Sequence, residues 1–330
     1  MDADMTTLEL HTGSLRMNEV AHEIADGMAD QTESLRVRTF RLPGGARVID
    51  AGVEVDGGIE AGLALAEICM GGLGSVTMST VQIGGESHPG VLVWTDHPAI
   101  SCMASQYAGW AISVDKFFAM GSGPLRAHAR VERELFEKLD YAEEAARGIL
   151  VLEGRMLPTD AVATWVAEKA RLQPSQLTFV VAPTASLAGG VQIAARILET
   201  GLHKMETLGF DVRRIVSGMG TAPLPPVAKN DLRAIGRTND CILYGGQARY
   251  TVRASDAELA ELAPKVPASA SRDYGTPFYE IFQRYEGDFY KIDPLLFSPA
   301  EIWLTSAESG RTFHAGRLNP EVLAASCYPS

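Results

Sequence analysis

The chain has 330 residues, 41 acidic and 29 basic side chains, and a formal net charge of -12. At about 150 residues per domain, this length favours two domains or one large α/β unit. A hydrophobic fraction of 46% with 21% charged residues is typical of a globular protein and excludes a disordered chain. The acidic balance argues against a nucleic-acid partner, because phosphate contacts need a concentrated basic face.

The four cysteines are far apart in the sequence, at Cys69, Cys102, Cys241 and Cys327. No C-x-x-C, H-x-x-x-H or H-E-x-x-H motif occurs, so we expect no metal site. The first 13 residues lack the basic start and apolar core of a signal peptide. No window reaches the roughly 18 uninterrupted apolar residues of a membrane helix. We therefore expect a cytoplasmic protein with reduced thiols and no membrane partner.

The first part of the chain predicts helices that alternate with short strands. Ser14 is placed to cap a helix whose apolar stripe, Val20, Ile24 and Met28, repeats every four residues. The alternation over residues 35–50, with a Pro-Gly-Gly turn in the middle, then predicts a β-hairpin.

A second helix is predicted over residues 59–70, where the apolar stripe ends at a pair of glycines. Strand-like runs follow at residues 76–83 and 91–95. A further helix is expected over residues 126–139.

The middle of the chain carries a strong strand–helix–strand pattern. A buried strand over 149–152 and an amphipathic helix over 160–170 lead to a second strand over 177–181, and a long helix is expected over 191–208. Short apolar strands separated by helices indicate sheets covered by helices, the arrangement of an α/β fold. A hairpin is predicted at residues 302–314.

No linker or internal repeat marks a domain boundary. We place the boundary near residue 155, which gives a first α/β domain over residues 1–155 and a second α/β domain over residues 156–330.

Polar residues follow the strand over 177–181 at its carboxyl end, where ligands bind in many α/β folds. Thr184 and Ser186 lie there, and the amides near Gly189 begin a helix whose positive end suits an anionic group. Glycine-rich segments elsewhere let the backbone approach a ligand. None of them fits a P-loop or a complete G-x-G-x-x-G fingerprint, so a nucleotide-binding loop is disfavoured.

The helix expected over 191–208 carries three polar residues on one face. Gln192, Arg196 and Glu199 follow spacings of four and three residues. A solvated surface pair of little energy is one interpretation of Arg196 and Glu199. The surrounding sequence is otherwise apolar, which is equally consistent with charges directed into a cleft, and periodicity alone leaves both interpretations open.

Many segments in the same order resemble the methenyltetrahydromethanopterin cyclohydrolase family. The resemblance runs from about residue 18 to residue 323. It is carried by residues 48–53, 67–73, 95–99, 116–124, 181–186, 243–246, 277–282 and 288–294.

The resemblance implies a two-domain α/β subunit with a pterin pocket between the domains, assembled as a homotrimer. It implies hydrolysis of 5,10-methenyltetrahydromethanopterin to the 5-formyl derivative, with the pterin as substrate and with no metal or redox cofactor. The family's R-x-x-E-T-G motif is matched from Arg196 to Gly201, so the catalytic roles carry over to Arg196 and Glu199. Lys116 matches a lysine in the family's K-x-F-A-M-G-S-G-P segment.

The expected chemistry agrees with these residue types. The methenyl carbon between two nitrogens is electrophilic, and attacking water must lose a proton, which Glu199 can accept as a general base. Arg196 can hold Glu199 ionised and orient the water or the developing oxygen. The expected substrate-binding residues are Lys116, Gly121, Ser122, Gly123, Thr184, Ser186 and Gln192.

Two other functions stay open at this point. One is another pterin-dependent one-carbon enzyme, such as a formyl transferase or a dehydrogenase. A dehydrogenase is disfavoured because the glycine fingerprint of a nicotinamide site is incomplete. The other is a non-catalytic pterin-binding subunit, which is disfavoured because both Arg196 and Glu199 are present.

Overall fold

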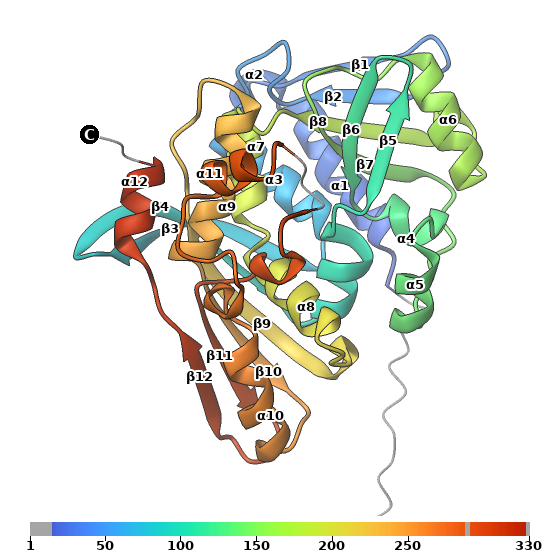
Figure 1. Ribbon diagram of the computed structural model, residues 1–330. Helices are drawn as coiled ribbons and strands as arrows, with labels where there is room; N and C mark the ends of the chain where they lie inside the picture. Colours follow the sequence, from blue (N-terminus) through green and yellow to red (C-terminus); the bar gives the residue numbers. More distant parts are fainter. Residues whose placement is uncertain (1–14, 288–290, 328–330) are drawn as a thin grey trace, which may run out of the picture.

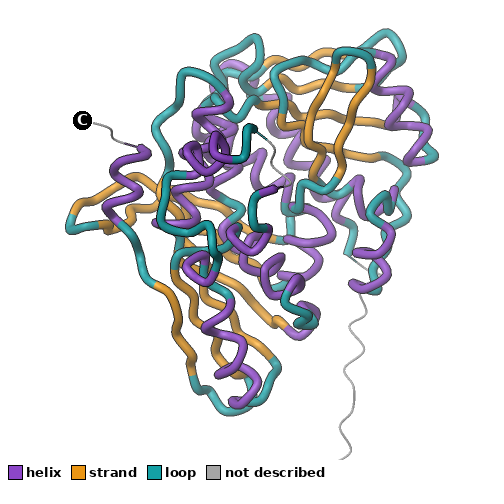
Figure 2. Tube along the Cα trace, in the orientation of Figure 1, coloured by secondary structure: helices purple, strands orange, loops and turns teal. Residues whose placement is uncertain are grey.

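The computed structural model describes residues 15–287 and 291–327 of the chain. Two six-stranded mixed sheets form its framework, with helices between and around them (Figure 1, Figure 2). This arrangement confirms the mixture of sheets and covering helices expected of an α/β fold.

The strands of the first sheet are β1 (Arg38–Arg41), β2 (Arg47–Asp50), β5 (Trp110–Val114), β6 (Phe117–Ser122), β7 (Gly148–Glu153) and β8 (Leu177–Ala182). Their order in space is β1-β2-β8-β7-β6-β5. The central strands β2, β8 and β7 are parallel, and the outer pairs are antiparallel. The parallel strands therefore present their carboxyl ends at one edge.

The strands of the second sheet are β3 (Gly74–Ile83), β4 (Glu86–Thr95), β9 (Ile215–Pro223), β10 (Gln247–Val252), β11 (Glu301–Ser306) and β12 (Thr312–Gly316). Their order is β12-β11-β10-β9-β4-β3, and only β10 and β11 are parallel.

The helices of the first half are α1 (Met17–Asp30), α2 (Thr32–Leu35), α3 (Ile59–Cys69), the π-helix η2 (Ala99–Gln106), α4 (Leu125–Ala129), α5 (Arg133–Leu139) and α6 (Asp160–Ala170). Those of the second half are α7 (Leu187–Ala194), α8 (Ile197–Thr207), α9 (Asp231–Gly245), α10 (Asp256–Leu262), α11 (Phe278–Arg284) and α12 (Pro320–Cys327).

Alternating side chains of the first sheet pack on helices of opposite faces. Leu152 and Phe179 point to one face and pack with Val162 of α6. Val151 and Val180 point to the other face, where α1, α3 and α7 supply the buried partners. This is the period-two alternation of a sheet buried on both sides.

Helices α3, α7, α8 and η2 lie between the two sheets. Val93 and Ile302 of the second sheet belong to the same apolar core as Leu198 and Leu202 of α8 and Met103 of η2. Helices α3 and α7 contribute residues both to this core and to the core of the first sheet. The space between the sheets is therefore where residues from distant parts of the chain meet.

Several local predictions are confirmed. The hairpin over residues 35–50 is β1 and β2, which pair antiparallel from Arg38 with Asp50. The strand–helix–strand pattern is β7, α6 and the parallel strand β8. The C-terminal hairpin is β11 and β12. The first helix begins at Met17, and its expected cap Ser14 lies outside the described residues.

Two expected helices are each divided in two, which corrects those predictions. The helix expected over 126–139 is broken at Arg130, whose φ of 50° is left-handed. The turn brings Glu132 back to the fully buried guanidinium of Arg126, 2.6 Å away. The helix expected over 191–208 is broken between Ala194 and Ile197, because α7 packs against both sheets whereas α8 packs on the second.

The strands of the two sheets alternate along the chain. Strands β3 and β4 join the second sheet, whereas β8 joins the first. The predicted domain boundary near residue 155 therefore does not coincide with the division between the sheets.

All four cysteines are buried and none forms a disulfide in the structure, although the sulfurs of Cys241 and Cys327 lie 3.8 Å apart. None of the helices in residues 15–287 and 291–327 is both long and apolar enough to cross a membrane.

Candidate active site

Arg196 lies at the junction of α7 and α8, where the backbone tightens. Its N–H donates to the carbonyl of Ile193, three residues back, and the next helical bond runs from Thr200 to the carbonyl of Arg196. The side chain leaves this junction toward the interior between the sheets and is only 7% exposed.

The guanidinium of Arg196 is held by acceptors from three elements. It donates to the backbone carbonyl of Gln106 at the end of η2, to Ser122 Oγ at the end of β6 (3.2 Å), and to Gln192 Oε1 on α7 (3.1 Å). The planar fork of donors in an arginine suits such a fixed arrangement. Arg196 is therefore a rigid, buried positive charge.

The hydrogen bonds continue from Gln192 to the carboxyl ends of the parallel strands. Gln192 Nε2 lies 3.4 Å from Glu153 Oε2, at the end of β7, and Thr184 Oγ1 donates to Glu153 Oε1 at 2.6 Å. Ser122 also lies 3.5 Å from the sulfur of Cys69. We call Cys69, Gln106, Ser122, Glu153, Thr184, Gln192 and Arg196 the Arg196 network.

Glu199 lies one helical turn from Arg196 and is 6% exposed. No hydrogen bond or ion pair joins its carboxylate to another residue in the described part of the chain. Burial raises the pKa of the Glu199 carboxyl, while the charges of Arg196, His203 and Arg126 act in the opposite direction. The interpretation of Arg196 and Glu199 as a solvated surface pair is therefore wrong.

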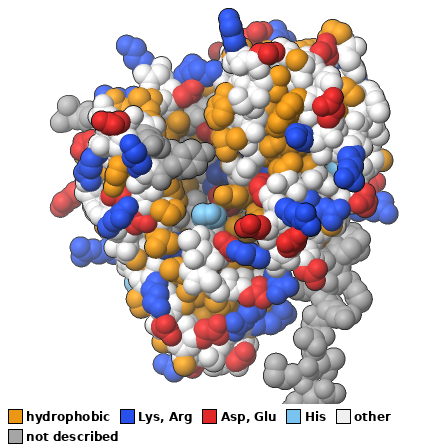
Figure 3. Space-filling model, turned by 45° about the vertical axis from the view of Figure 1, so that its right-hand side comes forward, with side chains coloured by type: hydrophobic (Ala, Val, Ile, Leu, Met, Phe, Trp, Pro, Cys, Tyr) orange, Lys and Arg blue, Asp and Glu red, His pale blue; other side chains and the backbone are white. Residues whose placement is uncertain are grey.

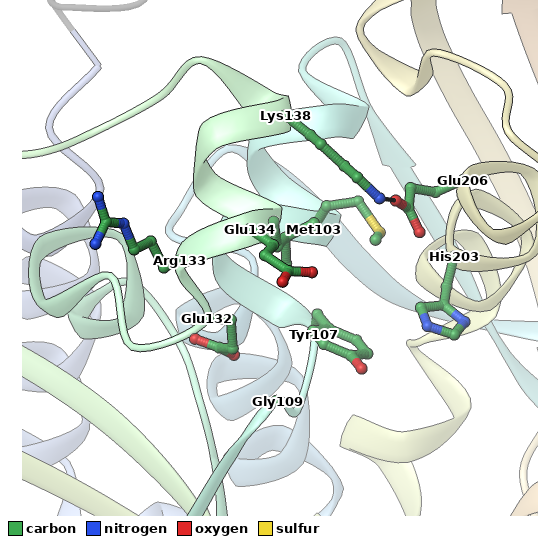
Figure 4. Close-up of a pocket in the computed structure, with 10 residues that line it drawn as sticks. Met103, Tyr107, Gly109, Glu132, Arg133, Glu134, Lys138, His203 and Glu206 are labelled. Atoms are coloured by element: carbon green, nitrogen blue, oxygen red, sulfur yellow. Dashed lines mark hydrogen bonds and ion pairs between the residues drawn. The ribbon is translucent and has the colours of Figure 1, made fainter.

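A cavity of about 490 Å³ opens between α5, α8 and the end of η2. Tyr107 and His203 line it and stack on each other, with ring centroids 5.2 Å apart and an angle of 15° between the planes. Figure 4 shows the two rings side by side, with a dashed line that joins Lys138 to Glu206. Figure 3 shows the surface hollowed between the two halves of the molecule, with charged side chains and a histidine there.

Glu199 lies on α8 between Arg196, which precedes the helix, and His203, which lines this cavity. Burial is the largest cause that raises the pKa of Tyr107 and that of the Cys102 thiol, and the charge of Glu199 raises both further. Both residues belong to η2 or follow it directly. The carboxylate is thus close enough to η2 and to Tyr107 to influence both electrostatically.

Comparison with known proteins identifies relatives of similar length. A family model described as "Cyclohydrolase (MCH)" matches residues 16–327. The methenyltetrahydromethanopterin cyclohydrolase of Methylobacillus flagellatus is 46% identical over 307 residues, which cover 93% of this chain and 94% of that protein. The proteins of the same name from Methylobacterium organophilum and Methanococcoides burtonii are 45% and 42% identical, and each alignment covers 94% of this chain and 97% of the relative.

This chain belongs to the methenyltetrahydromethanopterin cyclohydrolase family. The family resemblance expected from the sequence is confirmed, and the match covers both sheets and the helices from α1 to α12.

Four of the residues expected to bind the substrate or act on it come together. Ser122, Thr184, Gln192 and Arg196 all belong to the Arg196 network, although they come from four separate elements or loops. Glu199 lies beside it. The residues predicted from strand ends and those predicted from helical spacing therefore lie at one place in the molecule.

The glycines expected near the substrate make contacts within the fold. The N–H of Gly123, whose φ is +103°, donates to the carbonyl of Ser105. Gly121 pairs with Trp110 inside the first sheet. Ser186 caps α7, since its Oγ accepts the N–H of Gly189 at 3.0 Å. The amides of Gly123 and Gly189 thus have partners within the chain, and a contact between these segments and the substrate stays a prediction.

Lys116 lies apart from the other expected site residues within one subunit. It is exposed in the turn between β5 and β6, whereas Ser122 is buried at the far end of β6. Six residues of extended strand span roughly 20 Å. A contact between Lys116 and the substrate stays a prediction.

Sequence reasoning missed Glu153, Tyr107 and His203. Glu153 follows a buried strand, so the strand-end argument used for Thr184 would have found it. His203 stands four residues after Glu199, the spacing of side chains on one helix face. Tyr107 carried no local signal. Among residues 15–287 and 291–327, no group of three or more His, Cys, Asp or Glu is arranged to hold a metal ion.

Proposed function

We propose that this chain hydrolyses 5,10-methenyltetrahydromethanopterin reversibly to 5-formyltetrahydromethanopterin. Its family membership supports the reaction, and one observation indicates which residues perform it. Glu199 is a buried carboxylate without a hydrogen-bond partner among the described residues, one helical turn from an immobilised arginine. Such a group is suited to take a proton from water at an electrophilic carbon.

The reaction joins the oxygen of water to the methenyl carbon and breaks one of the two bonds from that carbon to nitrogen. Glu199 takes a proton from the attacking water and returns it to the departing nitrogen. The hydroxyl of the intermediate then loses its proton as the formyl C=O bond forms. The substrate cation becomes a neutral product, so each turnover releases one proton and needs no electron carrier.

Arg196 acts in this scheme by fixing charge and geometry. Its positive charge favours the ionised form of Glu199. Because an arginine does not give up its own proton near neutral pH, it serves as an orienting group and not as the base.

We propose that the pterin lies in the space between the two sheets, with its reactive carbon beside Glu199. The aromatic wall of Tyr107 and His203 offers a surface on which a planar ring can stack. Glu153, Thr184 and Gln192 of the Arg196 network offer hydrogen-bonding groups.

The experiment that tests the function follows the loss of the methenyl chromophore by ultraviolet absorbance, with no nicotinamide and no second substrate present. We expect the absorbance to decay at a rate proportional to the concentration of the protein. Decay that requires an added acceptor would identify a transferase, and decay that requires nicotinamide a dehydrogenase. Binding without any decay would identify a non-catalytic subunit.

We further propose a homotrimer that works in the cytoplasm. The trimer rests on the resemblance to the family, and the four buried, unpaired thiols support a reducing compartment. Sedimentation of the protein at working concentration tests the trimer, and a monomer there would contradict it.

A further inference from the structure

The proposed reaction leaves a proton on a buried group. The water supplies two protons, of which one ends on the departing nitrogen and one must leave the enzyme. Glu199, which receives them, is only 6% exposed. A second group therefore has to accept the proton from Glu199 before the next turnover. This inference rests on the proposed function.

His203 is placed to be that group. It follows Glu199 by four residues on α8, so the two side chains lie on one side of the helix with Cβ atoms about 6 Å apart. Unlike Glu199, His203 is only partly buried and lines the 490 Å³ cavity. It stands between the buried carboxylate and the space that water can enter.

The ring of His203 is held in place while its nitrogens stay available. Tyr107 stacks on it at 5.2 Å, and the buried Arg126 in turn lies 5.2 Å from the centre of the Tyr107 ring. Neither ring nitrogen of His203 forms a hydrogen bond with another residue in 15–287 or 291–327. Imidazole is the side chain best suited to accept and release a proton near neutral pH.

We propose that His203 acts through Glu199 as a positioning residue. It receives the proton from Glu199 and passes that proton to the water of the cavity. The proton moves from a carboxylate oxygen of Glu199 to one ring nitrogen of His203, directly or through one water. It then leaves to cavity water, and both groups return to their starting charge.

Several charged and titratable groups surround Glu199 and His203. Glu199 is faced by Arg196 at the helix junction, Arg126 of α4, Cys102 of η2, Tyr107 after it, and Tyr250 of β10. In the cavity of His203, Glu132 is paired with Arg126, and Lys138 is paired with Glu206. Glu134 is the further acidic residue that lines this cavity.

The test replaces His203 by glutamine, which keeps a polar side chain but cannot carry the proton. In weakly buffered solution we expect kcat of His203→Gln to fall about 10- to 100-fold, at the low end of what proton transfer contributes. Added imidazole should restore much of the lost rate, because a diffusible base can take the proton from the cavity. His314→Gln is the control, since His314 is 47% exposed and pairs with Glu301 on the second sheet.

Two results would overturn the role of His203. One is an unchanged kcat and pH profile in His203→Gln, and the other is a loss of rate that imidazole does not restore. If His203→Gln does not fold, His203→Asn is measured in the same way. A wild-type protein that does not hydrolyse the methenyl substrate would overturn the proposed function itself, which is a separate outcome.

Discussion

Arg196 and Glu199 are three residues apart, but their side chains make different contacts. The guanidinium of Arg196 binds three acceptors from η2, β6 and α7. The carboxylate of Glu199 has no such partner in the described residues, and the two groups form no ion pair within 4.0 Å. The arginine is thus fixed by the fold, whereas the carboxylate stays free to exchange protons.

This difference predicts how Arg196→Ala changes the pH dependence of the reaction. Burial raises the pKa of Glu199, and Arg196 is the largest influence that lowers it. Without Arg196 the pKa rises further, and the base is ionised only at higher pH. We therefore expect a lower kcat/KM near neutral pH and an acidic limb of the pH profile displaced to higher pH.

The control for this prediction is Arg16→Ala, since Arg16 is 75% exposed and pairs only with Glu19 in the described structure. If Arg196 and Glu199 act as one unit, the double variant with Glu199→Gln should turn over scarcely slower than the slower single variant. Additive losses, or an acidic limb that does not move in Arg196→Ala, would show that the two residues act independently.

At the scale of residues, the sequence predicts those members of the candidate site that follow from helical spacing or from the end of a strand. Helical spacing relates Gln192, Arg196 and Glu199, and strand ends relate Thr184 to Ser186. The contacts that complete the site join residues far apart in the chain. Gln192 and Glu153 are 39 residues apart, and Arg196 and Gln106 are 90 apart. Periodicity carries no information on such distant pairs.

At the scale of elements, tertiary packing decides where helices end. No glycine or proline interrupts the sequence between Val191 and Leu198, so local propensity predicts one helix. The structure divides it because Ala188 packs toward the first sheet and Leu198 toward the second. The division places Arg196 at a junction, from which its side chain reaches β6 and η2.

Helix α8 also approaches the second sheet closely, and this contact gives a prediction. A Cβ added to Gly201 would overlap the hydroxyl of the buried Tyr250 and lie 3.0 Å from its Cζ. Tyr250 is fixed by a hydrogen bond to the carbonyl of Leu198. We expect Gly201→Ala to be destabilising, because overpacking of about 1–3 kcal/mol exceeds the gain in helix propensity of up to about 1 kcal/mol.

Gly27→Ala is the matched control for Gly201→Ala. Gly27 lies in α1, and a Cβ there would meet no heavy atom within 4 Å. Thermal unfolding should therefore show a higher Tm for Gly27→Ala and a lower Tm for Gly201→Ala. Equal stability of the two variants would mean that the contact between α8 and β10 is looser than it is in the structure.

At the scale of the whole molecule, each sheet is assembled from separate parts of the chain. Strand β4 pairs with β9, from Gly90 with Pro223, and β2 pairs with β8, from Arg47 with Thr178. The sequence shows the individual strands but not these pairings, so a single boundary near residue 155 could not describe the two sheets. The interleaving brings the end of β6 next to η2 and to the junction of α7 and α8, where the candidate site lies.

The role of Glu199 is tested most directly by the turnover of Glu199→Gln, followed as the loss of methenyl absorbance. The amide keeps the size and much of the hydrogen bonding of the carboxylate but cannot act as the base. We predict that kcat falls about 100- to 10,000-fold while KM changes little and Tm stays near that of the wild type. Turnover of Glu199→Gln at the wild-type rate would contradict the proposed mechanism.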